Sequence, residues 1–375
     1  MARGKALAAL ALLAGATLAL AGGGQQGESA ADLLRKSMGR RFPVNVVAVI
    51  LQRDPAAEGT YQRVKVARAK DGKARHTVLQ PLRMAGVEQV DDGELLRVYL
   101  PDRRSVIVQD SPQKESAEPE ERIAQAKRNY VFSVGGKERI AGRTAVRVVA
   151  EPKADDMAIR RYYLDEKSGY PLRLEVVGDR GELKVIFDTV AIEFPDRLNR
   201  DVFAMNALPG TETIRYTRPK TLSSRAQAQA VVGFRPILPE RIPYGFNVQE
   251  MQYNPGPGWK SVVIRLTDGL VRATVYQWKP NGKKIESVED SSAIEVNGIR
   301  LMIVSDLPAP VRMRILQSFV GQAKSEGGPQ AIRLIGALTP AVPCALRALE
   351  LAGAVRTFAD LDHRVVPIAD PIELR

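Results

Sequence analysis

The chain has 375 residues, of which 45% are hydrophobic; this is enough for two domains with buried cores and excludes a chain that is disordered as a whole. The formal net charge is +12 at pH 7, but the basic residues are scattered along the chain and do not alternate with aromatic residues. This distribution argues against nucleic-acid binding and is typical of solvated surfaces, although it also suits an anionic lipid or an acidic partner.

The first residues have the features of a secretory signal peptide. A basic start precedes an apolar run from Ala6 to Leu20, and a small-x-small cleavage site ends at Ala21. The apolar run is about 15 residues long, short of the roughly 20 that a membrane-spanning helix needs. We therefore expect residues 1–21 to be removed, with an uncleaved transmembrane anchor as the alternative. Cys344 is the only cysteine, so no intramolecular disulfide and no lipid-anchoring cysteine after the apolar run is expected.

Residues 28–218 are predicted to form a first domain made mainly of antiparallel strands. An amphipathic helix comes first, with Ser29 as its N-cap. Segments rich in β-branched and aromatic residues, separated by turn signals such as Asp71-Gly72, then predict strands at 44–52, 60–69, 74–80, 87–90, 95–100 and 105–109. The charged segment from Glu118 to Asn129 carries its acidic residues first and predicts a helix that crosses the sheet.

The strand pattern resumes after this helix, at residues 130–134, 137–141, 144–151 and 160–165. Between Tyr162 and Phe194, turn residues at 167–169 and 179–181 separate runs of strand formers, which is typical of sequential hairpins. A short helix at 198–203 is expected to end the domain. The predicted fold class is therefore mainly β with a few helices.

A second, smaller β-rich domain is predicted at residues 231–321. Residues 219–230 lack an apolar period and strand formers, so we expect a linker there. Beyond a proline-punctuated extended stretch, the pattern predicts a helix at 310–318 and strands at 247–253, 261–267, 271–278, 284–288, 292–296 and 299–304. Residues 322–375 are expected to form a helical tail.

The sequence carries no recognisable catalytic or metal site. Its two histidines are His76, within a predicted strand, and His363, whose aspartate neighbours in the chain cannot converge on one ion without further ligands. A G-x-S-x-G nucleophile elbow is absent, and Cys344 lies in an apolar run that favours a buried, inert thiol. We expect no enzyme, no metal and no cofactor. An exported hydrolase is the disfavoured alternative, because paired carboxylates can meet in the fold.

A twisted antiparallel sheet that a helix covers only in part leaves an apolar concave face, which suits acyl chains or peptide segments. The period of two along the strands predicts pairs of valines or leucines on common faces. The candidate ligand-binding residues are Val64, Val66, Val106, Val108, Leu172 and Leu174. We expect most such positions to be ordinary core and a minority to touch a ligand.

Two runs of the first domain resemble a known family. These are GGKERIAGRTAVRVV, Gly135 to Val149, and RYYLDEKSGYPLR, Arg161 to Arg173. They are similar to the "AGR" strand and the "LD-x-x-(S/T)-G-x-P-L" hairpin of the RseB/MucB sigma-E regulatory proteins, relatives of the lipoprotein carriers LolA and LolB. The runs from Leu238 to Phe246 and from Leu266 to Leu270 resemble that family's "LP-x-GF" and "(S/T)DGL" segments. The resemblance covers residues 30–320.

The resemblance implies an open, LolA-like half-barrel with helices over its mouth, followed by a smaller β-rich domain. Such proteins are periplasmic, bind the extracytoplasmic part of a membrane-anchored anti-sigma factor, and release it when lipid or mislocalised lipoprotein accumulates. The implied partners are thus an anti-sigma factor and lipid or lipoprotein acyl chains, with peripheral membrane contact and no nucleic acid. The family offers no catalytic residue to carry over.

A periplasmic carrier of lipoproteins or lipids is the alternative function; it is favoured by the first domain alone and not by the second. The sequence departs from the family after residue 320. Residues 325–358 faintly resemble the last half of a STAS domain, although a helical tail packed on the second domain is preferred.

Overall fold

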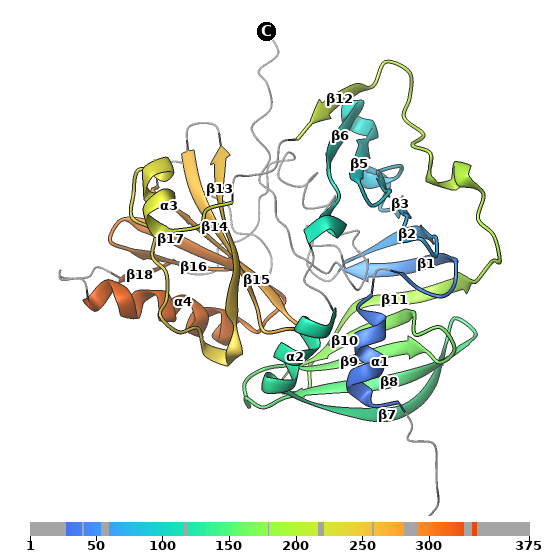
Figure 1. Ribbon diagram of the computed structural model, residues 1–375, viewed down its shortest axis with the longest axis horizontal. Coiled ribbons are helices and arrows are strands. Elements are labelled where there is room, and N and C mark those ends of the chain that lie inside the picture. The colour runs from blue at the N-terminus through green and yellow to red at the C-terminus, as the bar shows by residue number, and fades with distance from the viewer. Residues whose placement is uncertain are drawn as a thin grey trace, which may run out of the picture.

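The computed structural model describes residues 28–39, 41–53, 60–115, 119–178, 180–216, 221–256, 259–280, 291–325 and 332–335. The expected signal peptide, the strand expected at 284–288, Cys344 and His363 lie outside these residues. The described residues form two antiparallel-rich sheets of 12 and six strands (Figure 1). No helix among them combines the length and the apolar character needed to cross a bilayer.

The first domain is built on the 12-stranded sheet, in the order β12-β6-β5-β4-β3-β2-β1-β11-β10-β9-β8-β7. The sheet is open, with β12 and β7 at its two edges. Its strands are β1 Val46–Arg53, β2 Tyr61–Arg68, β3 Ala74–Gln80, β4 Glu88–Asp91, β5 Leu95–Leu100, β6 Ser105–Asp110, β7 Tyr130–Ile140, β8 Arg143–Pro152, β9 Ile159–Asp165, β10 Pro171–Val177, β11 Leu183–Glu193 and β12 Glu212–Arg215.

The hairpin between β9 and β10 illustrates why consecutive strands pair. The carboxylate of Asp165 accepts hydrogen bonds from the backbone N–H and the hydroxyl of Ser168, at 2.9 and 2.8 Å. Gly169 then adopts a φ of 68°, a left-handed conformation that favours glycine. The turn predicted at residues 167–169 is thus confirmed, and it returns the chain antiparallel to β9.

Two helices lie against this sheet, α1 (Ala30–Ser37) and α2 (Pro119–Asn129). The Ser29 hydroxyl accepts a hydrogen bond from the backbone N–H of Asp32 at 3.2 Å, which confirms the predicted N-cap. Figure 1 shows α1 lying over the end of the sheet formed by β7, β8 and β9. Three short 3-10 turns join the strands on the way to α2, namely η1 Leu82–Met84, η2 Pro101–Arg103 and η3 Pro112–Glu115; a fourth, η4 Arg200–Phe203, follows β11.

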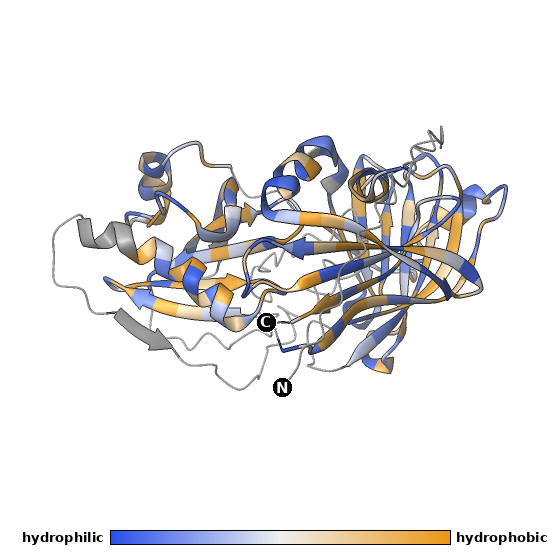
Figure 2. Ribbon diagram, turned by 90° about the horizontal axis from the view of Figure 1, so that it is seen from below, coloured by the Kyte–Doolittle hydropathy of each residue, from blue (hydrophilic) through white to orange (hydrophobic). Residues whose placement is uncertain are grey.

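The second domain contains the six-stranded sheet, in the order β13-β14-β15-β17-β16-β18. Helix α4 (Ala309–Ser325) packs on β16 and β17 through Val311, Ile315 and Phe319, all fully buried at helical spacing. The other elements are α3 Arg225–Val232, η5 Pro243–Gly245, β13 Asn247–Gly256, β14 Trp259–Thr267, β15 Arg272–Trp278, β16 Ser291–Val296, β17 Ile299–Val304 and β18 Ile332–Ile335. In Figure 2, apolar and polar residues alternate along many strands of both sheets, as the period of two requires.

The fold class predicted from the sequence is confirmed: a mainly β chain with an open large sheet and a smaller β-rich second unit. Several elements differ from the prediction. The strands predicted at 130–134 and 137–141 form the single strand β7, and the helix predicted at 198–203 is the 3-10 turn η4. Helix α3 occupies part of the expected linker, because Ser224 caps it and Ala228 and Val232 are buried against the second domain. Strand β12 was not predicted, and β18 forms at residues 332–335, where a helical tail was expected. Both strands have only four residues, and pairing with a distant strand determines them.

Candidate binding site

The concave face of the large sheet is lined by apolar side chains from neighbouring strands. The registers place Val66 beside Ala48 on β1 and, through β3 and β4, in line with Val98 on β5 and Ile107 on β6. Because directly paired residues of antiparallel strands share a face, these side chains lie on one face, in a row that also includes His76 on β3 and Gln89 on β4. The apolar side chains of this row are all buried, and they belong to a single apolar cluster.

The six residues predicted to bind a ligand do not form one surface. Val64, Val66 and Leu172 lie in the apolar cluster just described, whereas Leu174 pairs with Phe187 and packs in a second cluster beneath α1 and α2. Val106 and Val108 alternate with Ile107 and therefore point to the opposite face of β6. Spacing of two placed each pair on a common face, but only the pairing of strands decides which face that is.

Helices α1 and α2 cover the second cluster. Leu34 of α1 and Ala126 of α2 are fully buried and pack in one cluster with Val148, Tyr162 and Leu174 of the sheet. The same cluster continues without a break into the core of the second domain. The apolar interior of the first domain is therefore joined to that of the second, at the end of the sheet where α2 lies.

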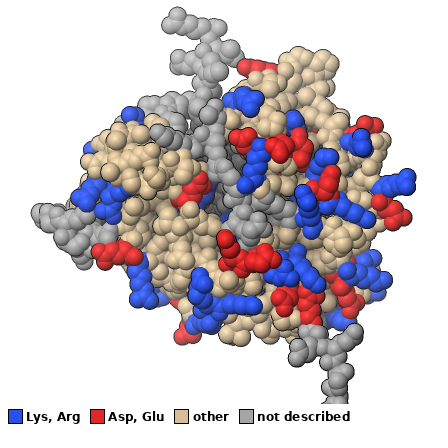
Figure 3. Space-filling view, viewed as in Figure 1, with Lys and Arg blue, Asp and Glu red and all other residues tan. Residues whose placement is uncertain are grey.

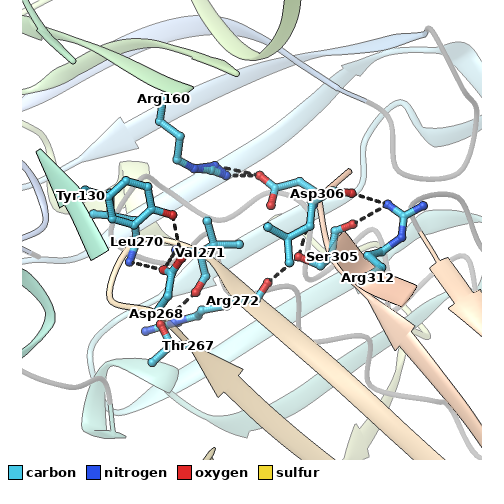
Figure 4. Close-up of polar contacts among 11 residues, drawn as sticks. Tyr130, Arg160, Thr267, Asp268, Leu270, Val271, Arg272, Ser305, Asp306 and Arg312 are labelled. Carbon is cyan, nitrogen blue, oxygen red and sulfur yellow. Dashed lines mark hydrogen bonds and ion pairs between the residues drawn. The ribbon is translucent and has the colours of Figure 1, made fainter. Parts of the chain in front are cut away.

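Polar contacts at this meeting point form what we call the domain junction, the contacts of α2, Tyr130, Asp156 and Arg160 with the second domain. Figure 4 draws those of Tyr130 and Arg160. The carboxylate of Asp268, in the turn between β14 and β15, accepts a hydrogen bond from the hydroxyl of Tyr130 at 2.6 Å. It also accepts from the backbone N–H groups of Leu270 and Val271 at 2.9 and 2.7 Å. Asp268 is thus held by its own turn and by the first strand after α2.

Burial dominates the electrostatics of this pair. It raises the pKa of Asp268 above the usual value, while the hydrogen bonds from Tyr130 and from the turn oppose that shift. The pKa of Tyr130 is raised well above 10, by burial and by the Asp268 charge. Tyr162 is also buried nearby, and burial raises its pKa to about 12. The tyrosine hydroxyls therefore remain protonated donors at neutral pH.

Side chains of α2 also donate hydrogen bonds to the backbone of the same turn. The side-chain amide of Gln125 donates to the carbonyl of Thr267 at 2.7 Å, and that of Asn129 donates to the carbonyl of Asp268 at 2.9 Å. Gly269 has a φ of 102°, and a Cβ at this position would lie 2.5 Å from the backbone of Ala126 and Arg122. The helix and the turn thus touch where only glycine fits.

A buried ion pair joins β9 to the loop between β17 and α4. Both terminal nitrogens of Arg160 contact the carboxylate of Asp306, and both side chains are nearly inaccessible to solvent. Burial lowers the pKa of the Arg160 guanidinium, but Asp306, Tyr162 and Tyr130 together outweigh burial and raise this pKa above its usual value. Arg312, in α4, fixes the same loop: its guanidinium donates to the carbonyls of Ser305 and Leu307, at 3.2 and 2.6 Å (Figure 4).

A third polar contact lies at the rim of the junction. The hydroxyl of Tyr244, in η5, donates to the carboxylate of Asp156 at 2.6 Å, and Arg314 of α4 contacts the same carboxylate. Arg314 also donates to the Tyr244 hydroxyl at 2.9 Å. The pKa of Tyr244 is raised by partial burial and by Asp156.

Sequence reasoning did not identify the junction. Its central turn lies within Leu266–Leu270, a stretch singled out only as a resemblance, and Tyr244 and Gly245 lie in the other such stretch. Arg160 was counted among scattered basic residues. The available signal was the period of two: Arg160 and Arg161 are neighbours on a strand, so one of them must point to the covered face. Arg161 lies on the other face, 3.9 Å from Glu175.

The described residues contain no group of three or more His, Cys, Asp or Glu side chains arranged to hold a metal ion. On the face shown in Figure 3, lysines and arginines are interspersed with aspartates and glutamates. His76 lies in β3 and is buried on the concave face, paired with Val66 and Gln89. Its environment is that of a core residue.

The comparisons with known proteins agree with this architecture. Residues 55–206 match the model of the MucB/RseB N-terminal domain. The fold is similar to that of MucB in complex with MucA(peri), with a TM-score of 0.53 and 17% identity over 76% of this chain and 96% of MucB. The Pseudomonas aeruginosa MucA/MucB complex gives a TM-score of 0.53, 16% identity and the same coverages. A structure of MucB alone gives 0.52 and 17%, over 77% of this chain and 96% of MucB.

No curated protein matches the chain. The likeness to MucB extends across both sheets, since it includes nearly all of that protein. The RseB/MucB resemblance inferred from the sequence is therefore confirmed, with residues 55–206 matching the model of that family's N-terminal domain.

Proposed function

We propose that this chain is an exported, non-enzymatic regulator that binds the extracytoplasmic part of a membrane-anchored anti-sigma factor. The observation that carries the proposal is the match of residues 55–206 to the MucB/RseB N-terminal domain. The fold similarity to MucB, which has been solved in complex with the periplasmic part of MucA, supports it. In this proposal the protein works outside the cytoplasmic membrane, after removal of residues 1–21.

The second part of the proposal is that lipid or lipoprotein acyl chains bind on the concave face and weaken the contact with the anti-sigma factor. The apolar cluster around Val66 and the cluster beneath α1 and α2 support it. The second cluster is buried beneath the two helices, so an acyl chain enters it only if α1 or α2 moves off the sheet. Lipid binding and a change in the helices are therefore coupled.

The experiment that tests the proposal is capture of the tagged mature protein from cross-linked cells of its own source, with bound proteins and lipids identified by mass spectrometry. We expect one dominant single-pass membrane protein with a cytoplasmic sigma-binding domain. Its purified extracytoplasmic segment should then bind the mature chain at 1:1 stoichiometry in isothermal titration calorimetry. Addition of acyl lipid should weaken this binding by a measurable factor, whereas a detergent-free buffer control should not.

The carrier function makes the opposite prediction. Capture of many lipoproteins or free acyl lipids, without a single-pass partner, would exclude the regulator and leave a carrier. The extensive polar and apolar contacts between the two domains favour the regulator, because a simple carrier does not need a second domain that is tightly packed against the first.

A further inference from the structure

The six-stranded sheet of the second domain has an apolar face that lies opposite α4. Strands β14, β15 and β17 contribute to this face, because paired residues share a face and every second residue along a strand returns to it. We call it the Trp278 face, after the residues that form one apolar cluster there: Val263, Tyr276, Trp278, Met302 and Val304. Helix α4 packs on the other face, against the alternate residues of β16 and β17.

The Trp278 face is covered. Val263, Tyr276 and Trp278 are each only 4% exposed, and every residue of β15 is buried, so this strand has a layer on both of its sides. On the other face the layer consists of α3, α4 and the extended stretch at Ile237, whose backbone is hydrogen-bonded to the side chain of Gln277. A second layer must therefore lie on the Trp278 face.

The first domain approaches this face without supplying that layer. Burial raises the pKa of Tyr216 to about 12, and the charge of Arg265 opposes this rise, so the chain just after β12 lies near the Trp278 face. The ring of Tyr216, however, packs against the concave cluster of the first domain, which is separate from the cluster around Trp278. Among the residues that the structure describes, every member of the Trp278 cluster belongs to the sheet itself.

The chain continues from the edge of this same sheet. Strand β18 pairs with β16 and ends at Ile335, the partner of Ala293, and Ala293 pairs in turn with Met302 of the Trp278 face. Strand β15 is three strand spacings from β18, which is about 14 Å. Four or five extended residues span about that distance, so the residues after Ile335 reach the face easily.

The sequence after Ile335 has the composition of a segment that needs an apolar surface. Of the 40 residues from 336 to 375, 22 are hydrophobic, compared with 45% of the whole chain. From Ala337 to Ala359 the only charged residues are Arg347, Glu350 and Arg356. So apolar a segment is poorly soluble unless it packs on a surface of matching character.

The burial of the Trp278 face decides between the possible occupants. The exposed fractions are those of a single chain, so neither a second copy nor a partner protein is needed to cover the face. The cover belongs to the same chain, and residues 336–375 combine the reach with the apolar character. Within them, Val342, Leu346 and Leu349 recur at the spacing of one helix face.

We propose that the segment from Ala337 to Ala359 docks on the Trp278 face and completes the second domain as its second apolar layer. A protein that uses this face as its binding surface must first displace the segment, which makes the segment a competitor built into the chain. This goes beyond the proposed function and requires neither an anti-sigma factor nor a lipid.

The test follows the fluorescence of Trp278 in the chain from residue 28 onward. The Trp259→Phe change leaves Trp278 as the only tryptophan, and acrylamide quenching then measures how well its ring is covered. Leu346→Asp and, independently, Leu349→Asp place a charge in the docked surface, so each should raise the Stern–Volmer constant about threefold or more. Val366→Asp is the matched control, because it adds the same charge to the tail outside the segment; it should leave the constant unchanged.

A reciprocal measurement starts from the face. Cys344 is the only thiol of the chain and lies within the segment, so its rate of reaction with a thiol reagent reports whether the segment is docked. Met302→Lys places a charge on the Trp278 face and should accelerate this reaction about tenfold or more. Met313→Lys is the matched control, because Met313 lies in α4 and packs against the other cluster; it should leave the rate unchanged.

Equal quenching of Trp278 in the parent chain and in both leucine variants would overturn the proposal, since another part of the molecule would then cover the face. Strong quenching in the parent chain itself would do the same, because the face would be open. Protection of Trp278 that disappears on dilution would assign the cover to a second copy and would also overturn it. Circular dichroism of each variant verifies that the strands are intact. These outcomes are separable from the proposed function, because the purified chain is the only protein present.

Discussion

At Gly269 the turn of the second domain lies directly against the backbone of α2. Because the φ of Gly269 is 102° and a Cβ would clash with the backbone of α2, Gly269→Ala should lower the free energy of unfolding by at least about 2 kcal/mol. Gly298→Ala is the matched control, since Gly298 has a φ of 71° and open space around it. Gly298→Ala should lower the free energy of unfolding by the backbone strain alone, about 1 kcal/mol. Urea unfolding measures both; equal losses would show that the α2 contact is unimportant.

His76 predicts how stability depends on pH. Burial, and the nearby Arg68 charge, lower its pKa from 6.5 to about 3, so the folded state holds the neutral form. The contribution of neutral His76 to the free energy of unfolding is complete above pH 6.5. It is lost as pH falls toward the folded pKa, because the unfolded chain then binds a proton at His76 and the folded chain does not. Between pH 7 and 5 this loss is about 2 kcal/mol.

The His76→Gln variant isolates this effect. Its free energy of unfolding should fall by about 2 kcal/mol less than that of the wild type between pH 7 and 5, because all other titrating groups are shared. Urea unfolding at the two pH values provides the comparison. Identical pH dependences would mean that His76 is solvated or protonated in the folded state.

The candidate site illustrates what spacing alone determines. The period of two correctly grouped Val64 with Val66 and Val106 with Val108, because alternation is a local property of a strand. It did not indicate that Val106 faces away from Val66, because this depends on the four successive strand pairings from β2 to β6. Burial on both faces made the two sets indistinguishable in sequence.

At the scale of elements, the contact between β9 and the loop before α4 rests on the Arg160–Asp306 ion pair. Removing one member leaves the other charge buried and unpaired, so Arg160→Met should lower the free energy of unfolding by about 3 kcal/mol or more. Arg161→Met, on the neighbouring residue, is the control. Its side chain is partly exposed and 3.9 Å from its partner, so its loss should stay below about 1 kcal/mol.

A double-mutant cycle completes this prediction. If the pair acts as a unit, Arg160→Met with Asp306→Leu should be less destabilising than the sum of the two single changes, because no buried charge remains. Strict additivity in urea unfolding would mean that the two side chains contribute independently.

The elements themselves were predictable to the extent that local chemistry defines them. The β9–β10 hairpin has its turn residues and its capping aspartate in sequence, and α1 has its N-cap. Strands β12 and β18 lack such signals, and each has only four residues. Strand β12 is exposed along its length and forms only because it can pair with β6. Helix α3 was missed because its two buried residues make too short an apolar pattern.

At the scale of the whole molecule, the order of the two units was visible in the sequence and their junction was not. Tyr130 and Asp268 are 138 residues apart, and Arg160 and Asp306 are 146 apart, so no local pattern connects them. The resemblance marked the stretch around Asp268 without assigning it a role. In the structure, the turn from Thr267 to Val271 accepts hydrogen bonds from side chains of α2 and β7.

The joined cores predict how the whole chain unfolds. One apolar cluster runs from α1 and α2 through β8–β10 into the second sheet, and the buried polar contacts of the junction lie beside it. Separating the domains would expose this cluster and leave Asp268 and Asp306 without their partners, so neither domain should open alone. The chain from residue 28 onward should therefore show one calorimetric transition, with the van't Hoff enthalpy equal to the calorimetric enthalpy.

The fragment of residues 28–216 supplies the comparison for this prediction. Without the second domain, its half of the shared cluster is exposed to water. Its transition should therefore occur at a lower temperature than that of the chain from residue 28 onward, or not at all. Gly269→Ala, which loosens the junction without altering the first domain, should move the full chain toward the behaviour of the fragment. A fragment that melts at the temperature of the full chain, or two transitions in the wild type, would mean that the junction transmits no stability. The chain would then behave as two independent modules, and a lipid bound in the first could not act on the second through their contact.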